Sequence, residues 1–279
     1  MSRAAGAADA SGPGALLRVS GLTVEYPGGG GWTRAVKGIS FEVPAGGAVA
    51  IVGESGSGKS SAASAIGRLT DLAGARVSGR IFFEGRDVVA MDARELREFR
   101  RRGVAYVFQE PMVSLNPVLS VRSQIEEVLE AVDAAAIRAC LEAARIPTAD
   151  AARIARAFPH ELSGGLQQRV MIAMALAKGA KLLILDEPTT ALDATVQKQI
   201  LMTLAELKKS RGIAMLFITH DLQVARAVAD RILVMRSGEV VDELTRAQGF
   251  EPRHEYARRL MAASLLNQVP KTAIAAEAR

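Results

Sequence analysis

The sequence has a single cysteine, Cys140, which stands in an alanine-rich stretch. One cysteine can form neither an internal disulfide nor a cysteine-based zinc or iron–sulfur site, so disulfide-stabilised secreted modules and zinc modules are excluded. We expect Cys140 to be a small buried apolar residue. This cysteine usage is typical of a protein in a reducing compartment.

Aromatic residues are scarce, at 4% of the chain, although 49% of all residues are hydrophobic. This composition favours α/β packing over a β-sandwich. No apolar run is long enough for a membrane helix, because the best one, residues 170–185, is interrupted by Lys178 and Lys181. The start of the sequence has no apolar stretch typical of a signal peptide, and we expect a flexible tail there. Any membrane-spanning part is then expected in another subunit.

Charge of one sign is in small excess only. The chain has 35 basic and 30 acidic residues, which gives a formal net charge of +5, spread along the sequence. A small and dispersed excess is typical of a mildly basic surface and is a weak indication of nucleic acid or an anionic membrane as partner. At 279 residues, one large domain or one domain with a subdomain is expected.

What the sequence does contain is a glycine-rich turn between a predicted strand and a predicted helix. The turn fits the pattern G-x-x-x-x-G-K-[ST], in which successive backbone N–H groups point into one concavity and the helix adds the positive end of its dipole. Lys59 can then reach the β- and γ-phosphates of a nucleotide, and the Ser60 hydroxyl is placed to bind Mg²⁺. An ordinary Gly/Ser-rich connection is the alternative. The residues predicted to bind ATP here are Gly53, Glu54, Ser55, Gly56, Ser57, Gly58, Lys59, Ser60 and Ser61.

Strand and helix patterns alternate in the second half of the chain. The stretch 181–186 is continuously apolar up to Asp186, which indicates a strand buried on both faces of a parallel sheet. Helix, strand and helix patterns follow at 194–211, 212–219 and 222–229. This alternation predicts an α/β fold with a doubly wound parallel sheet.

Other parts of the chain have a different character. Residues 16–26 and 35–43 are predicted strands, and residues 121–145 have helical periodicity without a strand signal. We therefore predict a flexible tail (1–15), an ATP-binding core with a β subdomain and the phosphate loop (16–110), a helical subdomain (111–162), the second part of the core (163–244) and a C-terminal extension (245–279).

Two carboxylates close the predicted strand that ends at Asp186. A carboxylate at this end of a parallel strand lies where open α/β sheets bind ligands. Asp186 can hold the Mg²⁺ shell, and Glu187 can polarise an attacking water near the γ-phosphate. General-base help of this kind is worth about 10²–10⁴ in rate. The alternative, a pair of surface carboxylates, is disfavoured by the phosphate loop upstream.

A second glycine motif, Leu-Ser-Gly-Gly-Leu-Gln-Gln at residues 162–168, directly precedes a predicted helix. Alone it would be a helix cap. It also offers N–H donors at a helix N-terminus, and so a second anion site. Because the phosphate loop already binds the phosphates within this chain, we expect the second site to serve a nucleotide bound to another copy.

These motifs, followed by Ala-Leu-Asp at 191–193 and Thr-His-Asp at 219–221, resemble in kind and order the nucleotide-binding subunit of an ABC transporter. The resemblance covers about residues 16–243. It implies a P-loop NTPase (ABC ATPase) core with a parallel sheet, an N-terminal antiparallel β subdomain and an inserted helical subdomain. It also implies ATP hydrolysis with Mg²⁺, in a dimer where each ATP lies between one phosphate loop and the partner's Leu-Ser-Gly-Gly motif.

The same resemblance assigns roles to individual residues. Tyr26 matches the aromatic residue that stacks on adenine, Gln109 the glutamine that touches Mg²⁺ or water, and His220 the histidine that contacts the γ-phosphate. Without the motifs, each of these three would be read as structural or solvated. The catalytic set is then Glu187, His220 and Gln109, and the Mg²⁺ ligands are Ser60, Gln109 and Asp186. Contacts to the partner's ATP fall on Leu162, Ser163, Gly164, Gly165, Gln167 and Asp193.

Shorter stretches narrow the resemblance. Residues 108–117, 169–177 and 195–201 are similar to importers for oligopeptides, dipeptides and nickel. Pro-Arg-His-Glu-Tyr at 252–256 resembles their C-terminal Pro-Arg-His-Pro-Tyr element, with Glu255 in place of the second proline. This implies an ATP-hydrolysing subunit that powers import of peptides, nickel or a metal chelate from a peripheral position on the cytoplasmic face of the inner membrane.

The implied partners are a second ATPase subunit in a heterodimer or homodimer, two integral membrane permease subunits and, indirectly, an extracytoplasmic solute-binding protein, with no nucleic acid. The alternative function is a soluble ABC ATPase that acts on nucleic acid or ribosomes. Repair ATPases of that kind carry a coiled coil or zinc modules between the glycine motifs, and this chain has neither heptads nor paired cysteines. Translation factors of that kind have two cassettes per chain, and this chain has one. A protein with an inactive site is disfavoured because Lys59, Asp186, Glu187 and His220, which are predicted to bind or hydrolyse the nucleotide, are all present.

Overall fold

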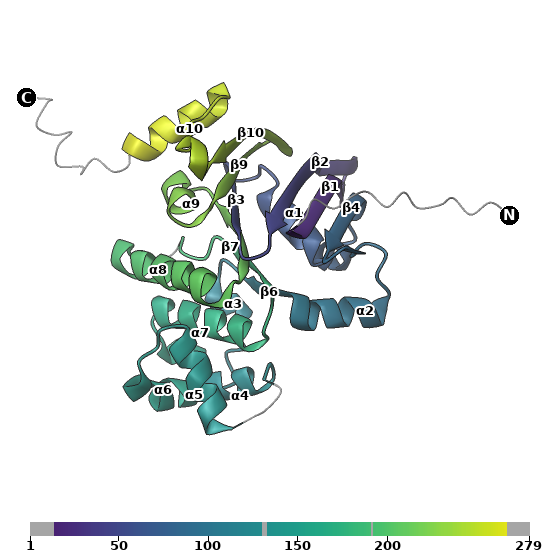
Figure 1. The fold of residues 1–279 in the computed structure, drawn as a ribbon. Coiled ribbons are helices and arrows are strands. Elements are labelled where there is room, and N and C mark those ends of the chain that lie inside the picture. The colour runs from purple at the N-terminus through teal and green to yellow at the C-terminus, as the bar shows by residue number, and fades with distance from the viewer. Residues whose placement is uncertain (1–13, 130–132, 191, 267–279) are drawn as a thin grey trace, which may run out of the picture.

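The computed structural model describes residues 14–129, 133–190 and 192–266. Its centre is a six-stranded sheet in the order β10-β9-β3-β8-β7-β6, in which the strands from β9 to β6 run parallel and β10 is antiparallel. Figure 1 shows helices packed around this sheet. Its strands are β3 (Ala48–Val52), β6 (Val104–Val107), β7 (Leu182–Asp186), β8 (Ala214–Thr219), β9 (Arg231–Arg236) and β10 (Glu239–Thr245).

Strand β3 shows why the central strands are apolar without alternation. All five of its residues are buried. Ala48, Ala50 and Val52 belong to the core beneath the helices, whereas Val49 and Ile51 belong to the core shared with the other sheet. Each face of the strand therefore packs on a different layer, as expected for a parallel sheet covered on both sides. The predicted α/β fold with a parallel sheet is confirmed.

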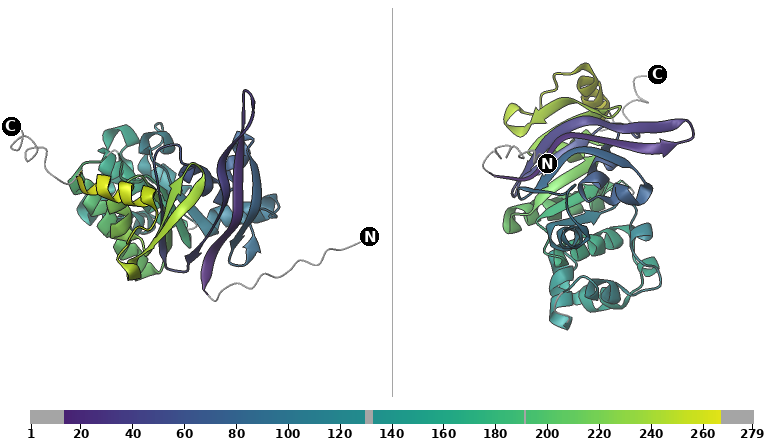
Figure 2. Two further views of the ribbon diagram at one scale, coloured as in Figure 1. Left: turned by 90° about the horizontal axis from the view of Figure 1, so that it is seen from above. Right: turned by 90° about the vertical axis from the view of Figure 1, so that its right-hand side faces the viewer.

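A four-stranded antiparallel sheet forms a separate layer, in the order β2-β1-β4-β5 (Figure 2). Its strands are β1 (Ala15–Gly28), β2 (Gly31–Pro44), β4 (Arg76–Phe83) and β5 (Arg86–Asp87). The predicted N-terminal β layer is therefore present. Of the tail predicted at 1–15, residues 1–13 lie outside the described residues, and β1 begins at Ala15.

Helix α1 (Lys59–Ile66) begins directly after the phosphate loop and packs between the two sheets. Its residues Ala62, Ala63, Ala65 and Ile66 are fully buried. A 3₁₀ turn (Leu69–Ala73) follows. Further along the chain, α2 (Ala93–Glu98) is fixed by a capping box at Asp92 and ends in a π-helical turn (Phe99–Gly103).

A group of short helices occupies one end of the molecule (Figure 1). They are α4 (Val121–Glu126), α5 (Ala134–Ala143) and α6 (Thr148–Arg156), followed by a 3₁₀ turn (Pro159–Glu161). A shorter helix, α3 (Pro111–Ser114), precedes them and lies nearer the sheet (Figure 1). The helical pattern over residues 121–145 is therefore two helices. The start of the second helix is set by Asp133, whose carboxylate accepts the N–H of Ala136 at 2.6 Å and caps α5.

Helix α7 (Gly164–Ala177) joins this helical group to the sheet, because it packs against α4 and α5 on one side and against β6 on the other. Cys140 of α5 is 7% exposed, and its thiol donates to the carbonyl of Ala173 in α7 at 3.1 Å. Burial raises the pKa of the Cys140 thiol to about 11. The expectation of a small buried apolar residue agrees with this environment. The domain boundaries given above stay a prediction.

The remaining helices are α8 (Ala194–Arg211), α9 (Leu222–Val228) and α10 (Glu255–Leu266), with a 3₁₀ turn (Arg246–Gln248) before α10. Helix α10 packs against α9 and β10 (Figure 1). Residues 267–279 of the predicted C-terminal extension lie outside the described residues. In the part of the chain that the structure describes, no helix is both long enough and apolar enough to span a bilayer.

Candidate functional site

The phosphate loop runs from β3 to α1 through two positions that only glycine fits. A Cβ on Gly53 would lie 2.1 Å from the carbonyl oxygen of Met235, and one on Gly58 would lie 2.3 Å from that of Ala35. Gly58 also has a φ of 101°, in the left-handed region. The loop is thus held tightly between β9 and β2. Glu54, Ser55, Gly56 and Ser60 face solvent along it, and Ser61 is half-buried.

Lys59 is enclosed by this loop and is only 5% exposed. Its Nζ donates to the carbonyl oxygens of Gly53 at 2.9 Å and Glu54 at 2.8 Å. Burial lowers the pKa of Lys59, and the nearby carboxylates of Glu187 and Asp186 act in the opposite direction. The ammonium therefore lies inside the loop on carbonyl ligands that phosphate oxygens can replace.

Two oxygen side chains meet beside the loop at the end of β7. The Ser60 hydroxyl donates to Oδ1 of Asp186 at 3.1 Å. Burial raises the pKa of Asp186, and the hydrogen bond from Ser60 partly offsets that shift. A hydroxyl and a carboxylate side by side are hard oxygen donors of the type that Mg²⁺ prefers. The residues present therefore fit the metal that the sequence predicts.

Glu187 is the meeting point of the predicted catalytic residues. Its Oε2 lies 3.4 Å from Nε2 of Gln109 and 3.2 Å from Nδ1 of His220, and it accepts the Thr190 hydroxyl at 2.8 Å. Gln109, Glu187 and His220 follow β6, β7 and β8, so the parallel sheet brings the ends of three strands together. The φ of Glu187 is 47°, a left-handed conformation that costs energy in a non-glycine residue and is typical of functional sites.

Thr190 was not predicted as a site residue. It stands three residues after Glu187, and its hydroxyl holds the Glu187 carboxylate. The sequence signal that could have indicated this contact is a hydroxyl residue three positions after Glu187, in the turn that follows the strand. A second unpredicted contact comes from Tyr256, whose hydroxyl accepts the backbone N–H of Glu54 at 3.2 Å.

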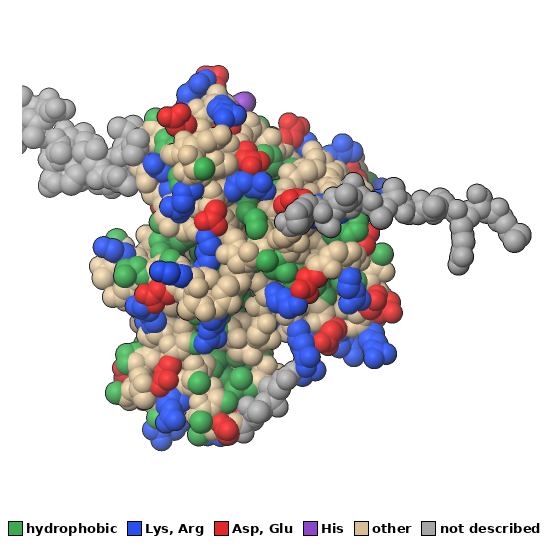
Figure 3. All heavy atoms as spheres, in the orientation of Figure 1, with side chains coloured by type: hydrophobic (Ala, Val, Ile, Leu, Met, Phe, Trp, Pro, Cys, Tyr) green, Lys and Arg blue, Asp and Glu red, His purple; other side chains and the backbone are tan. Residues whose placement is uncertain are grey.

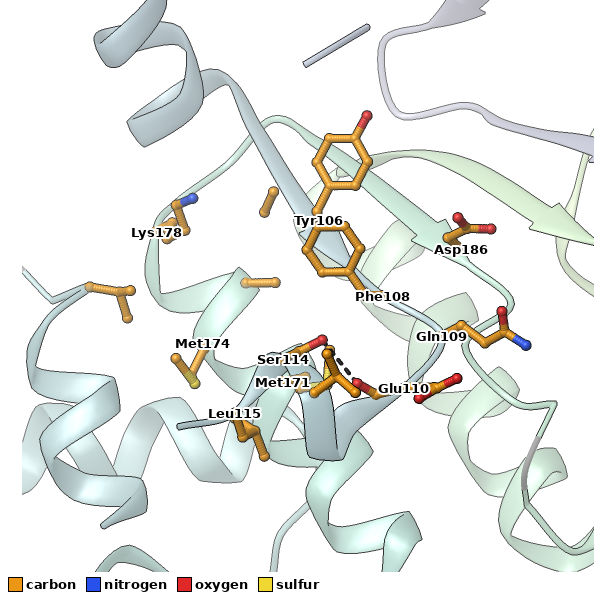
Figure 4. Close-up of a pocket in the computed structure, with 14 residues that line it drawn as sticks. Tyr106, Phe108, Gln109, Glu110, Ser114, Leu115, Met171, Met174, Lys178 and Asp186 are labelled. Atoms are coloured by element: carbon orange, nitrogen blue, oxygen red, sulfur yellow. Dashed lines mark hydrogen bonds between the residues drawn. The ribbon is translucent and has the colours of Figure 1, made fainter. Parts of the chain in front are cut away.

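A groove of about 650 Å³ extends from this site towards α7. Figure 4 shows Gln109 and Asp186 on one side of it and Lys178 and Met174 on the other. The aromatic rings of Tyr106 and Phe108 stack at 5.4 Å between their centroids. Phe108 is 42% exposed, so the groove presents apolar surface directly beside the catalytic residues.

The second glycine motif is built differently from the first. Ser163 is the N-cap residue of α7, but its side chain makes no capping hydrogen bond. Ser163 and Gly164 are exposed, whereas Leu162 and Gln167 are buried. The amide of Gln167 donates to the carbonyls of Pro159 at 2.8 Å and Leu162 at 3.1 Å, so this side chain holds the turn from inside.

The remaining predicted residues are Asp193, Gly165 and Tyr26. Asp193 caps α8 by accepting the N–H groups of Thr195 and Val196, both at 3.0 Å, so its carboxylate has a local structural task. A Cβ on Gly165 would lie 2.6 Å from Val196, which places the second glycine motif against the start of α8. Tyr26 is half-buried on β1, near the tip of the β1–β2 hairpin. The nucleotide contacts of these residues stay predictions.

The geometry agrees with what sequence comparison finds. The family model described as "ABC transporter" matches residues 36–190, which is more than half of the chain. The chain belongs to the ABC transporter family. It is an ATP-binding cassette of that family, and the resemblance inferred from the motifs is confirmed.

Its relatives carry the names of transport and import proteins. The chain is 47% identical to the peptidoglycan transport ATP-binding protein YejF of Agrobacterium fabrum, over 91% of this chain and 48% of the relative. It is 44% identical to the oligopeptide transport ATP-binding protein OppD of Bacillus subtilis, over 88% of this chain and 71% of the relative. It is also 44% identical to the glutathione import ATP-binding protein GsiA of Pectobacterium atrosepticum, over 89% and 42%. The chain thus spans about half the length of two of these ABC relatives.

Solved ABC structures show the same fold. The dimeric cassette MJ0796 in a post-hydrolysis state with ADP and Pi has a TM-score of 0.72 and 30% identity, over 82% of this chain and 98% of that one. The cassette cbiO1 of Clostridium perfringens, part of the transporter complex cbiONQ, has a TM-score of 0.72 and 26% identity, over 95% and 99%. The predicted ABC ATPase fold is confirmed by these neighbours.

Proposed function

We propose that this chain is the ATP-hydrolysing subunit of an ABC importer, with peptides as the class of solute. The observation that carries the proposal is the meeting of Gln109, His220 and Thr190 on one oxygen of Glu187, next to the Ser60–Asp186 pair. The relatives named for oligopeptide and glutathione transport support peptides. Nickel or a metal chelate stays the alternative solute, and none of the three relatives above is named for it.

The chemistry follows from the contacts of the site. Lys59 exchanges its carbonyl ligands for the β- and γ-phosphate oxygens of ATP. Ser60, Asp186 and Gln109 would hold Mg²⁺, which when bound neutralises charge on the phosphates. The three described contacts of the Glu187 side chain fall on Oε2, which leaves Oε1 for a water molecule. As this water attacks the γ-phosphorus, its proton passes to Glu187 and the bond to the bridging oxygen of ADP breaks.

The exposed second glycine motif supports a dimer. Ser163 is the exposed N-cap residue of a 14-residue helix, and its hydroxyl makes no capping hydrogen bond. Such a terminus binds anions through its N–H groups and its dipole. We therefore assign Ser163, Gly164, Gly165 and Asp193 to the surface that meets the partner's ATP, with the buried Leu162 and Gln167 supporting this turn from inside. The dimeric state of the similar MJ0796 cassette supports this pairing, here in a homodimer or a heterodimer.

The groove of Figure 4 supports contact with membrane subunits. Exposed apolar side chains line it, with Val113 78% and Phe108 42% exposed, and such surface next to a catalytic site is typical of a protein interface. On the face shown in Figure 3, basic and acidic side chains are interspersed, which gives little support to nucleic acid as partner. We infer two permease subunits as direct partners, an extracytoplasmic solute-binding protein as an indirect one, and a position on the cytoplasmic face of the membrane.

The experiment that tests the proposal is Glu187→Gln in the complex isolated with its membrane partners. The variant keeps the phosphate loop intact, so ATP binding is retained, while hydrolysis falls by about 10²–10⁴-fold because the base is gone. Glu98→Gln, in an exposed pair with Arg102, is the matched control and keeps the parent's rate. Hydrolysis at the parent's rate by Glu187→Gln contradicts the base assignment. Retention of the parent chain on nucleic acid at physiological salt, without membrane subunits, contradicts the importer.

A further inference from the structure

The C-terminal Pro-Arg-His-Glu-Tyr element is fixed to the edge of the central sheet. The carboxylate of Asp242, on β10, accepts the backbone N–H groups of Arg253 and His254, both at 2.7 Å. The N–H of Tyr256 then donates to Nδ1 of His254 at 3.1 Å. Glu255 is the first residue of α10 and pairs with Arg259 one turn later. These contacts set the position of Tyr256.

Tyr256 reaches from this element to the phosphate loop. Its side chain is buried at 7% exposure and is part of the main apolar core. The guanidinium of Arg236, the last residue of β9, lies 5.0 Å from the centre of its ring. Its hydroxyl oxygen accepts the N–H of Glu54, which stands 202 residues earlier in the chain. Burial raises the pKa of Tyr256, so the phenol stays neutral.

The contact fixes one particular peptide group. The peptide that joins Gly53 and Glu54 donates its N–H to Tyr256, and its carbonyl accepts the Lys59 ammonium at 2.9 Å. The peptide is thus held from both sides, by Lys59 on the phosphate side and by Tyr256 on the far side. When Lys59 turns to phosphate oxygens, its hold on the carbonyl weakens, whereas the bond to Tyr256 stays in place.

We propose that Tyr256 is a positioning residue of the phosphate loop, and that the docked C-terminal helix thereby sets the affinity for ATP. The hydroxyl keeps the Gly53–Glu54 peptide in the orientation from which the following N–H groups point into the loop. Tyr256 does not touch phosphate itself and acts through the backbone. The inference rests on the proposed ATP site and deepens it.

The test is Tyr256→Phe in the full-length chain, which keeps the buried ring and removes only the hydroxyl. Without the hydroxyl the Gly53–Glu54 peptide is no longer held before ATP arrives and must be ordered on binding. Because a hydrogen bond to the backbone contributes about 1 kcal/mol net, the Kd for ATP is expected to rise about fivefold. In the assembled complex KM for ATP rises by the same factor and kcat stays unchanged, since Glu187 and its contacts are intact. Hydrogen exchange measured by mass spectrometry quickens in the phosphate loop and not in β9.

Ser264→Ala is the matched control, because it removes another hydroxyl from α10. The Ser264 hydroxyl donates to the carbonyl of Met261 at 2.8 Å and accepts from Gln223 at 3.3 Å. Its loss is expected to leave the Kd for ATP and the exchange of the phosphate loop unchanged. An equal effect of both substitutions on the Kd contradicts the inference, because it indicates a general loosening of α10.

A second variant covers the case in which Tyr256→Phe does not fold. Asp242→Asn weakens the two hydrogen bonds that anchor residues 253–254 and keeps the tyrosine side chain itself. Because Tyr256 is then held less firmly against the phosphate loop, the Kd for ATP is expected to rise here too. An unchanged Kd and unchanged loop exchange in the folded variants overturn the role of Tyr256. That result is distinct from failure of the ATP site itself, which shows as unchanged ATP binding by Lys59→Met.

Discussion

The phosphate loop and the Leu162–Gln168 motif are both glycine-rich turns before a helix, yet the chain completes only one of them. In the first, Lys59 and Ser60 already have partners inside the chain, the loop carbonyls and Asp186. In the second, Ser163 is exposed and its hydroxyl makes no capping hydrogen bond. The difference supports the proposal that one chain preorganises the binding of its own nucleotide and offers the second motif to a nucleotide bound to another copy.

Packing explains how two similar turns come to differ. Helix α1 is buried between two sheets, and its loop is fixed by close approaches at Gly53 and Gly58. Helix α7 is anchored by its middle, where Val170 and Ile172 are fully buried, while Ser163 and Gly164 at its start are exposed. A helix N-terminus left open in this way is a binding surface for an anion.

The largest expected effect is on the completed site. Lys59→Met keeps the length of the side chain but removes the ammonium, whose charge-assisted bonds to phosphate are worth about 3 kcal/mol, or a hundredfold in Kd. We expect isothermal titration calorimetry with the isolated chain to show at least that loss of ATP affinity. Lys209→Met, on the exposed end of α8, is the control and keeps the parent's Kd. If Lys59→Met binds ATP with the parent's affinity, the phosphate loop is not a completed ATP site, and its contrast with the Leu162–Gln168 motif no longer holds.

A smaller effect is expected at the open site. Ser163→Ala leaves the Kd for ATP of the isolated chain within about twofold, because the phosphate loop is untouched. In the assembled complex, hydrolysis falls by about tenfold, since a hydrogen bond to the partner's nucleotide is lost. The measurement is the ATPase rate of the complex beside the Kd of the single chain. A loss of affinity in the single chain would show that the motif belongs to the same chain's site.

Ser120→Ala is the matched control for this serine. Ser120 is also an N-cap residue, but its hydroxyl accepts the N–H of Ser123 at 3.2 Å. Its loss is expected to cost about 1 kcal/mol of folding stability and to leave hydrolysis unchanged. Ser163→Ala, which breaks no capping bond, is expected to leave the thermal midpoint unchanged. The two serines therefore separate a structural cap from a binding group.

The parts of the site that the sequence predicts are those whose signal is local. Gly53 and Lys59 belong to one short pattern, and the continuously apolar stretch before Asp186 predicts a buried strand. The contact of Tyr256 with Glu54 joins residues that stand 202 positions apart, so no local pattern contains it. The family element at residues 252–256 marked the tyrosine without giving its task.

The fold shows the same division. Strand and helix types follow from periodicity, whereas the order of the strands in the sheet was not predicted, because it depends on pairing between segments far apart in the chain. The break between α4 and α5 was missed because helical periodicity continues across it, and a single capping residue, Asp133, decides where the second helix begins. The engagement of Gln167 inside the turn was also missed, because burial of a polar side chain depends on partners elsewhere in the chain.

The smallest expected effect lies behind the open site, at Cys140. Its thiol joins α5 to α7 and has a pKa of about 11, because burial disfavours the thiolate. At pH 8 alkylation of the native chain is therefore expected to be at least about a hundredfold slower than that of a free cysteine, and to quicken as the pH rises towards 11. Cys140→Ala is expected to cost about 1 kcal/mol of stability and to leave ATP binding unchanged. Rapid labelling at pH 8, followed by mass spectrometry, would instead show that α5 separates from α7, so that the exposed start of α7 is not held in place before a partner arrives.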